Sequence, residues 1–146
     1  MTNIEEMLPV TDSVAPQSPP VAFVDSSAIL AMVNRGDPTH EQAVAAYHEL
    51  VDQGYRLFTT DHVVNETVQM LELSFGPEVA RQWLRDQRLP IYHTDEQDVR
   101  RAIAHITSAR PGTRVSLTDA LSTVVMQRLG VSDAFAVDPD FLPDGA

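Results

Sequence analysis

The feature that most constrains the fold is the run Val21–Val24, which is apolar throughout and is followed at once by Asp25, Ser26 and Ser27. A strand with apolar residues at successive positions buries both faces, as strands of a helix-covered parallel sheet do. The run therefore predicts a buried strand that ends at Asp25. Ligands of open parallel sheets bind beyond the carboxyl ends of the strands, so Asp25 stands where chemistry can occur. Asp25 could equally cap a helix that begins near Ser27.

The rest of the chain alternates short apolar runs with segments of helical periodicity. This alternation predicts an α/β fold of three α/β/α layers, with a central, mostly parallel sheet of four to five strands. The further strands are expected at 56–59, 89–93 and 133–137, and the helices at 28–33, 37–54, 61–74, 77–84, 94–106 and 116–129.

Size and composition predict one domain. The chain has 146 residues, of which 43% are hydrophobic, and this is enough for one buried core. Residues 1–20 carry four prolines without a periodic apolar pattern, so we expect a mobile N-terminal tail before a single domain at 21–146. No apolar run reaches the roughly 18 residues that span a bilayer, and we expect a cytoplasmic protein with no membrane contact.

The charged residues exclude several chemistries. The formal net charge is −11, which argues against a broad basic surface for nucleic acid, so any such contact must be local or metal-assisted. All ten basic residues are arginine, and the absence of lysine excludes Schiff-base chemistry and the phosphate-binding loop. The absence of cysteine excludes thiolate catalysis and cysteine-ligated metals.

Four acids are candidates for one site. Asp25 and Asp138 end the first and last apolar strands, Asp119 lies in the first turn of a helix, and Glu66 lies in the second turn of another. Taken singly, Asp119 fits a capping box, Asp138 an Asp-Pro turn and Glu66 a helix surface. Together they are expected to face one edge of the sheet, with the hydroxyls of Ser26, Ser27, Thr118 and Ser122. Thr94 to Gln97 has the pattern of a capping box, and for Asp95, Glu96 and Asp98 we expect only helix capping.

A cluster of carboxylates without lysine predicts a divalent cation. Closely placed carboxylates repel one another, and a cation relieves that repulsion. Mg²⁺ and Mn²⁺ prefer carboxylate and water oxygens, and a pair of ions about 4 Å apart can activate water for phosphodiester cleavage.

Four segments also resemble one known family. Residues 24–30, 65–67, 116–122 and 136–141 are similar in order and spacing to the PIN-domain ribonucleases, most closely to the VapC-type toxins. The resemblance implies that Asp25, Glu66, Asp119 and Asp138 are catalytic and hold Mg²⁺ or Mn²⁺, the last two partly through water. It also implies that hydroxyls near these acids, those of Ser26, Ser27 and Thr118, order the site.

The same resemblance implies a metal-dependent endoribonuclease that is the toxin of a type II toxin-antitoxin system. Its expected partners are an RNA substrate, a small antitoxin protein and a second copy of the chain. Arg110 and Arg114 flank a Pro-Gly loop before Asp119 and could contact RNA phosphates, or they could be solvated loop residues.

Other functions remain open at this point. A dehalogenase-like phosphatase also places an acid after its first strand, but it needs a second acid two residues on, where this chain has Ser27, and a later lysine. A receiver-type signalling domain also needs a lysine. A degenerate PIN fold that only binds protein is a third alternative, and the presence of all four acids counts against it.

Overall fold

Among the residues that the structure describes, the central sheet has four parallel strands. The computed structural model describes residues 18–137. The strands lie in the order β4-β3-β2-β5, and every pairing between neighbours is parallel. Strand β2 is central, with Ala22 opposite Leu57 on one side and Asp133 on the other. The predicted parallel sheet is confirmed. The strands span β2 (Val21–Val24), β3 (Arg56–Thr60), β4 (Ile91–Tyr92) and β5 (Asp133–Phe135).

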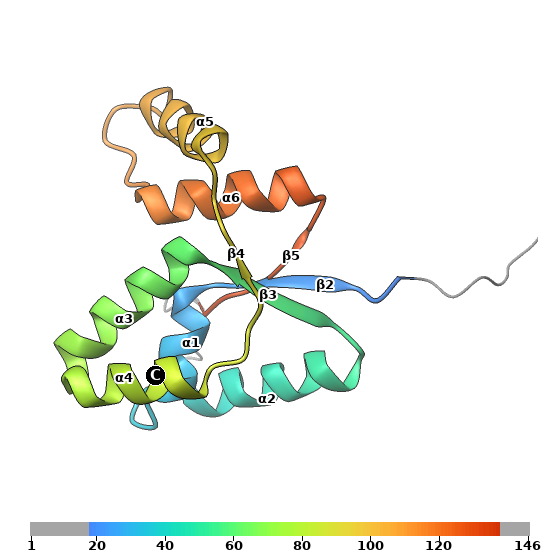
Figure 1. Ribbon diagram of the computed structural model, residues 1–146, viewed down its shortest axis with the longest axis vertical. Coiled ribbons are helices and arrows are strands. Elements are labelled where there is room, and N and C mark those ends of the chain that lie inside the picture. The colour runs from blue at the N-terminus through green and yellow to red at the C-terminus, as the bar shows by residue number, and fades with distance from the viewer. Residues whose placement is uncertain (1–17, 138–146) are drawn as a thin grey trace, which may run out of the picture.

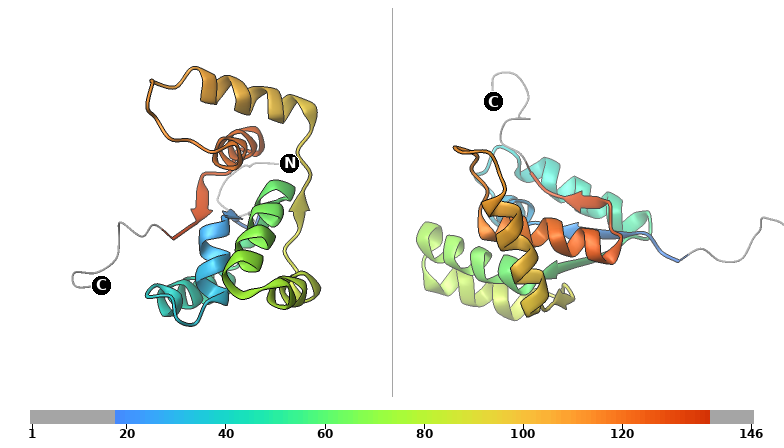
Figure 2. Two further views of the ribbon diagram at one scale, coloured as in Figure 1. Left: turned by 90° about the vertical axis from the view of Figure 1, so that its left-hand side faces the viewer. Right: turned by 90° about the horizontal axis from the view of Figure 1, so that it is seen from above.

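In the part of the chain that the structure describes, six helices cover the two faces of the sheet. Figures 1 and 2 show α1 to α4 on one side, and α6 on the other with α5 outside it. This is the expected three-layer arrangement. The helices span α1 (Ser26–Val33), α2 (His40–Asp52), α3 (Asp61–Phe75), α4 (Pro77–Asp86), α5 (Glu96–Thr107) and α6 (Leu117–Leu129). Within residues 18–137, no helix is long and apolar enough to cross a membrane.

Helix α1 begins directly after β2, two residues earlier than the expected start at Ala28. The reason is Asp25, which is the N-cap and accepts a hydrogen bond from the Ser27 amide. The strand interpretation and the capping interpretation of Asp25 therefore both hold. Helix α2, in contrast, begins later than expected, because Asp37 accepts hydrogen bonds from the amide and hydroxyl of Thr39 and holds a turn there.

The expected cap of α5 was wrong by one residue. The pattern Thr94 to Gln97 predicted a capping box, but Asp95 is the N-cap and Asp98 completes the box. Thr94 is not free to cap, because its amide and hydroxyl both donate to the Asp61 carboxylate at the start of α3. The strand expected at 89–93 is limited to Ile91–Tyr92, and the last strand ends at Phe135 rather than residue 137.

The buried side chains form two clusters. The main core joins β2, β3 and α1 to α2 and α3, and contains the Phe23 and Phe58 rings with centroids 5.8 Å apart. The second cluster is smaller and lies between α5 and α6, where Ala102 meets Leu121 and its neighbours. Helix α6 takes part in both clusters, because Val125 belongs to the main core.

Candidate active site

Asp25 lies at the carboxyl end of the central strand and is held there by three groups. Its amide donates to the Phe135 carbonyl, which extends the pairing between β2 and β5 by one residue. Its Oδ2 accepts from the Ser27 hydroxyl at 2.6 Å and from the Ser27 amide at 3.2 Å. The Ser27 hydroxyl in turn accepts from the Val137 amide at 3.0 Å. Ser27 therefore links Asp25 to the segment after β5.

Glu66 reaches the same edge of the sheet from α3. Its Oε1 accepts from the Ser26 hydroxyl at 2.7 Å, across forty positions of sequence. Ser26 is buried and Glu66 is half-buried. The adjacent serines thus serve different carboxylates, because Ser26 bonds Glu66 while Ser27 bonds Asp25.

Each of the two carboxylates has one oxygen that bonds no protein group within residues 18–137. Ser26 occupies Oε1 of Glu66 and Ser27 occupies Oδ2 of Asp25, so Oε2 and Oδ1 are left. Hydroxyl donors of this kind orient a carboxylate and leave an oxygen for a cation. The donor set suits a hard divalent ion, which prefers carboxylate oxygens.

Asp119 and Thr118 lie in the first turn of α6. Asp119 is exposed, and its amide donates to the Ser116 hydroxyl that caps the helix. Thr118 is half-buried, and its carbonyl accepts from the Ser122 hydroxyl at 3.0 Å. Neither side chain bonds Asp25 or Glu66 in the structure.

The structure brings two of the four predicted acids to one edge through the adjacent serines. In the part of the chain from 18 to 137, no three histidine, aspartate or glutamate side chains form a group able to hold a metal ion. Asp119 is thus not grouped with Asp25 and Glu66 here, and Asp138 lies outside the described residues. The convergence of all four acids stays a prediction.

Arg110 and Arg114 lie in the exposed loop between α5 and α6. Neither forms an ion pair with another residue of 18–137. The Arg110 carbonyl accepts from the Thr113 amide and closes the loop. Both guanidinium groups are thus available to an anion, and both residues lie in the loop that leads into α6.

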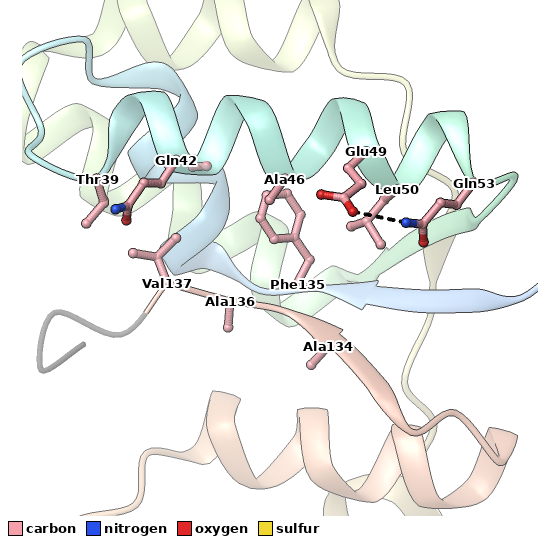
Figure 3. A pocket seen from close by; sticks show the side chains of 11 residues that line it. Thr39, Gln42, Ala46, Glu49, Leu50, Gln53, Ala134, Phe135, Ala136 and Val137 are labelled. Carbon is pink, nitrogen blue, oxygen red and sulfur yellow. Dashed lines mark hydrogen bonds between the residues drawn. The ribbon is translucent and has the colours of Figure 1, made fainter. Parts of the chain in front are cut away.

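One hollow of the described structure is not lined by Asp25. It has a volume of about 610 Å³ and lies between one face of α2 and the segment 134–137, as Figure 3 shows. Ala46, Leu50 and Phe135 make it largely apolar. A smaller hollow of about 290 Å³ is closer to the acids, with Ser27, Asp37 and Val137 in its wall.

Sequence reasoning missed a buried carboxylate. Asp98 is 0% exposed. Its Oδ1 accepts from Arg128 at 2.7 Å, and its Oδ2 accepts from the Tyr92 hydroxyl at 2.9 Å and from the Asp95 amide. Burial raises the pKa of Asp98, but these three donors outweigh it and lower that pKa below its ordinary value. The one signal in the sequence was its place four residues before Ala102, on the buried face of α5.

The family model of the PIN domain matches residues 22–142, which is most of the chain. This chain belongs to the PIN-domain family. The matched region of this PIN domain begins within β2 and includes all four predicted acids.

Among solved structures, this PIN domain is similar to VapC20 of Mycobacterium tuberculosis, described as a toxin that cleaves the sarcin-ricin loop. The TM-score is 0.69 at 27% identity, over 83% of this chain and 92% of VapC20. The protein is thus VapC-like in fold over nearly the full length of that toxin.

The curated proteins give a shorter match. The DNA mismatch repair proteins MutL of two Vibrio vulnificus strains, YJ016 and CMCP6, are each 33% identical to this PIN domain over 76 residues. That stretch is 52% of this chain but 11% of each MutL chain. The match therefore spans about a tenth of the length of those relatives.

Proposed function

We propose that this PIN domain is a metal-dependent endoribonuclease. The observation that carries the proposal is the pair of carboxylates at the carboxyl edge of β2, Asp25 and Glu66, each held by its own serine hydroxyl. Metal-dependent nucleases use such a pre-oriented acidic edge to hold cations beside the scissile phosphate. The family supports nuclease chemistry, and the similarity to VapC20 supports RNA as the substrate.

Mg²⁺ or Mn²⁺ is the proposed cofactor. When bound, the ion supplies charge neutralisation at the phosphate and lowers the pKa of a water molecule. The protein contributes the free oxygens of Asp25 and Glu66. Ser26 and Ser27 orient the two carboxylates by bonding the other oxygen of each. Asp119 and Asp138 are the remaining proposed acids, acting partly through water, and Thr118 is a proposed ordering hydroxyl.

We further propose the toxin role in a type II toxin-antitoxin system, located in the cytoplasm, where cellular RNA is found. A small antitoxin and a second copy of the chain are the proposed protein partners. The net charge of −11 favours a partner segment rich in basic residues. In this proposal residues 21–146 are one domain and residues 1–20 are a tail, and Arg110 and Arg114 contact the RNA backbone.

The test is cleavage of a panel of structured RNAs by purified full-length protein in Mg²⁺, in Mn²⁺ and in EDTA. We expect cleavage in both metals and none in EDTA. A thermal melt of the same protein reports the ion independently, because an ion that binds only the folded site raises the melting temperature by mass action.

Three variants complete the test: Asp25→Asn, Glu66→Gln and Asp119→Asn. Each is expected to remove nearly all cleavage and to leave the fold intact, and their losses should not add, because the acids act as one unit. Cleavage that persists in EDTA would contradict the metal mechanism. Parent protein that binds RNA without cleaving any of the panel in either metal would favour a binding module instead.

A further inference from the structure

Helices α5 and α6 form an arm, defined here as residues 96–129, whose two helices contact each other more than any other element, although α6 also contacts α3. The first half of α6 packs on α5 in the small second cluster, which contains Ala102, Ala120 and Leu121. Further along α6, Val125 enters the main core. Figure 2 shows the pair standing off the sheet, with α5 outermost. The angle of the arm therefore depends on contacts near the end of α6.

A polar joint lies where α5 begins and α6 ends, built around the buried Asp98 and including the exposed Arg128. The joint consists of Tyr92 at the end of β4, Asp98 of α5 and Arg128 in the last turn of α6. Asp98 accepts from both of the others, and Arg128 also bonds Asp95 at 2.9 Å. One fully buried carboxylate thus ties a strand of the sheet to both helices of the arm.

The joint lies at the opposite end of α6 from Asp119. At about 1.5 Å per residue, the axial distance from Arg128 to Asp119 is about 13 Å. A rotation of about 10° at the joint would therefore move Asp119 by about 2 Å, which is the length of a metal–oxygen bond. Within residues 18–137 Asp119 is not grouped with Asp25 and Glu66, and a rotation of the arm is a movement that would change its distance from them.

We propose that Tyr92, Asp98 and Arg128 are positioning residues, which set the angle of the arm and so place Asp119 beside Asp25 and Glu66. The inference rests on the proposed metal-dependent function. Geometry favours positioning over simple stabilisation. An ion pair with a partly exposed partner such as Arg128 contributes little net stability, whereas the hydrogen bonds of the buried Asp98 to Tyr92 and Arg128 fix one orientation of the parts that they join.

The first measurement is the angle of the arm itself, in protein without metal. Because the chain has no cysteine, spin labels can be attached through Thr107→Cys at the end of α5 and Glu72→Cys on α3, both exposed positions. We compare Tyr92→Phe and the double variant Asp98→Asn with Arg128→Gln, which avoids a buried unpaired charge. The matched control is Arg100→Gln, which breaks the exposed pair of Arg100 with Glu96 on the same helix.

The joint variants are expected to broaden or shift the distance between the labels, and Arg100→Gln is expected to leave it unchanged. In the same variants without the labels, Mn²⁺ affinity measured by calorimetry should fall about tenfold, as it does when residues that orient ligands are lost. In an Asp119→Asn background the joint variants should lower Mn²⁺ affinity no further, because they act through Asp119. A purely structural joint would lower the melting temperature equally in both backgrounds and leave Mn²⁺ affinity unchanged.

Unchanged label distances in both joint variants would overturn the inference, and so would additive losses of Mn²⁺ affinity with Asp119→Asn. Neither result would affect the proposed nuclease activity of the parent. If the parent itself binds no Mn²⁺, the proposed metal function fails and the positioning role fails with it, even where the labels report a changed angle.

Discussion

Asp25 and Asp119 show two different ways of placing a carboxylate. Asp25 ends the central strand, next to the main core, and Ser27 bonds it directly. Asp119 stands exposed in the first turn of α6, on a pair of helices whose contacts are mostly with each other. The first carboxylate is placed by neighbours one or two residues away, and the second by the angle of a whole element. Small changes in packing therefore affect Asp119 more than Asp25.

The largest expected effect is the loss of RNA cleavage when Asp25, at the end of β2, is replaced. Asp25→Asn should reduce RNA cleavage by a factor on the order of 10⁴, because the acids act as a unit. Glu96→Gln is the control, since Glu96 is exposed and pairs only with Arg100 within the described residues. The measurement is the single-turnover cleavage rate in Mg²⁺. An Asp25→Asn protein as active as Glu96→Gln would remove Asp25 from the site.

The next largest effect tests the hydrogen bond from the Ser27 hydroxyl to Asp25. Ser27→Ala removes the donor to Asp25 and the acceptor of the Val137 amide, so Mn²⁺ affinity should fall about tenfold and the free energy of unfolding by about 1 kcal/mol. Thr107→Ala removes an exposed hydroxyl that bonds only a carbonyl of its own helix and should change neither quantity. Equal Mn²⁺ affinities in the two variants would show that Asp25 does not need Ser27.

A third prediction concerns the arm, where the stability that Asp98 contributes should depend on pH. The folded state lowers the pKa of Asp98 from its ordinary value of 3.8, so the stability it contributes is present above that value and is lost as pH falls through the lower folded pKa. At pH 7 Asp98→Asn should be less stable than the parent by about 2 kcal/mol, and the difference should shrink below about pH 4. Urea unfolding at pH 7 and pH 3 measures it. An equal difference in unfolding free energy at the two pH values would mean that the partners of Asp98 do not favour its ionised form.

The smallest expected effect is on RNA binding by the loop of the arm. Replacing Arg110 and Arg114 by Gln should weaken binding equally across RNA sequences and reduce the slope of log affinity against log salt by up to about 1.4, the value for two contacts to single-stranded RNA. Arg56→Gln with Arg81→Gln is the matched control, with the same charge change on β3 and α4. Equal slopes for the two double variants would make Arg110 and Arg114 ordinary surface residues.

Several elements could be predicted because their signals are local. The apolar run before Asp25 and the helical spacing around Glu66 depend on neighbours within a few residues, and both elements formed where that spacing indicated. The start of α5, in contrast, has a distant cause. Thr94 did not cap α5 because Asp61, thirty-three residues earlier, accepts its hydrogen bonds.

The sequence by itself determined the alternation of strands and helices, the parallel sheet and the acid at the end of its central strand, because side-chain periodicity decides which surfaces are buried. Only the tertiary structure decided that Ser26 bonds Glu66, that Asp98 is an interior group rather than a surface cap, and that Asp119 is not grouped with Asp25 and Glu66. Those outcomes depend on partners thirty or more residues apart, such as Asp98 with Arg128 and Ser26 with Glu66. Local periodicity carries no information about such pairs, because the packing of whole elements brings them together.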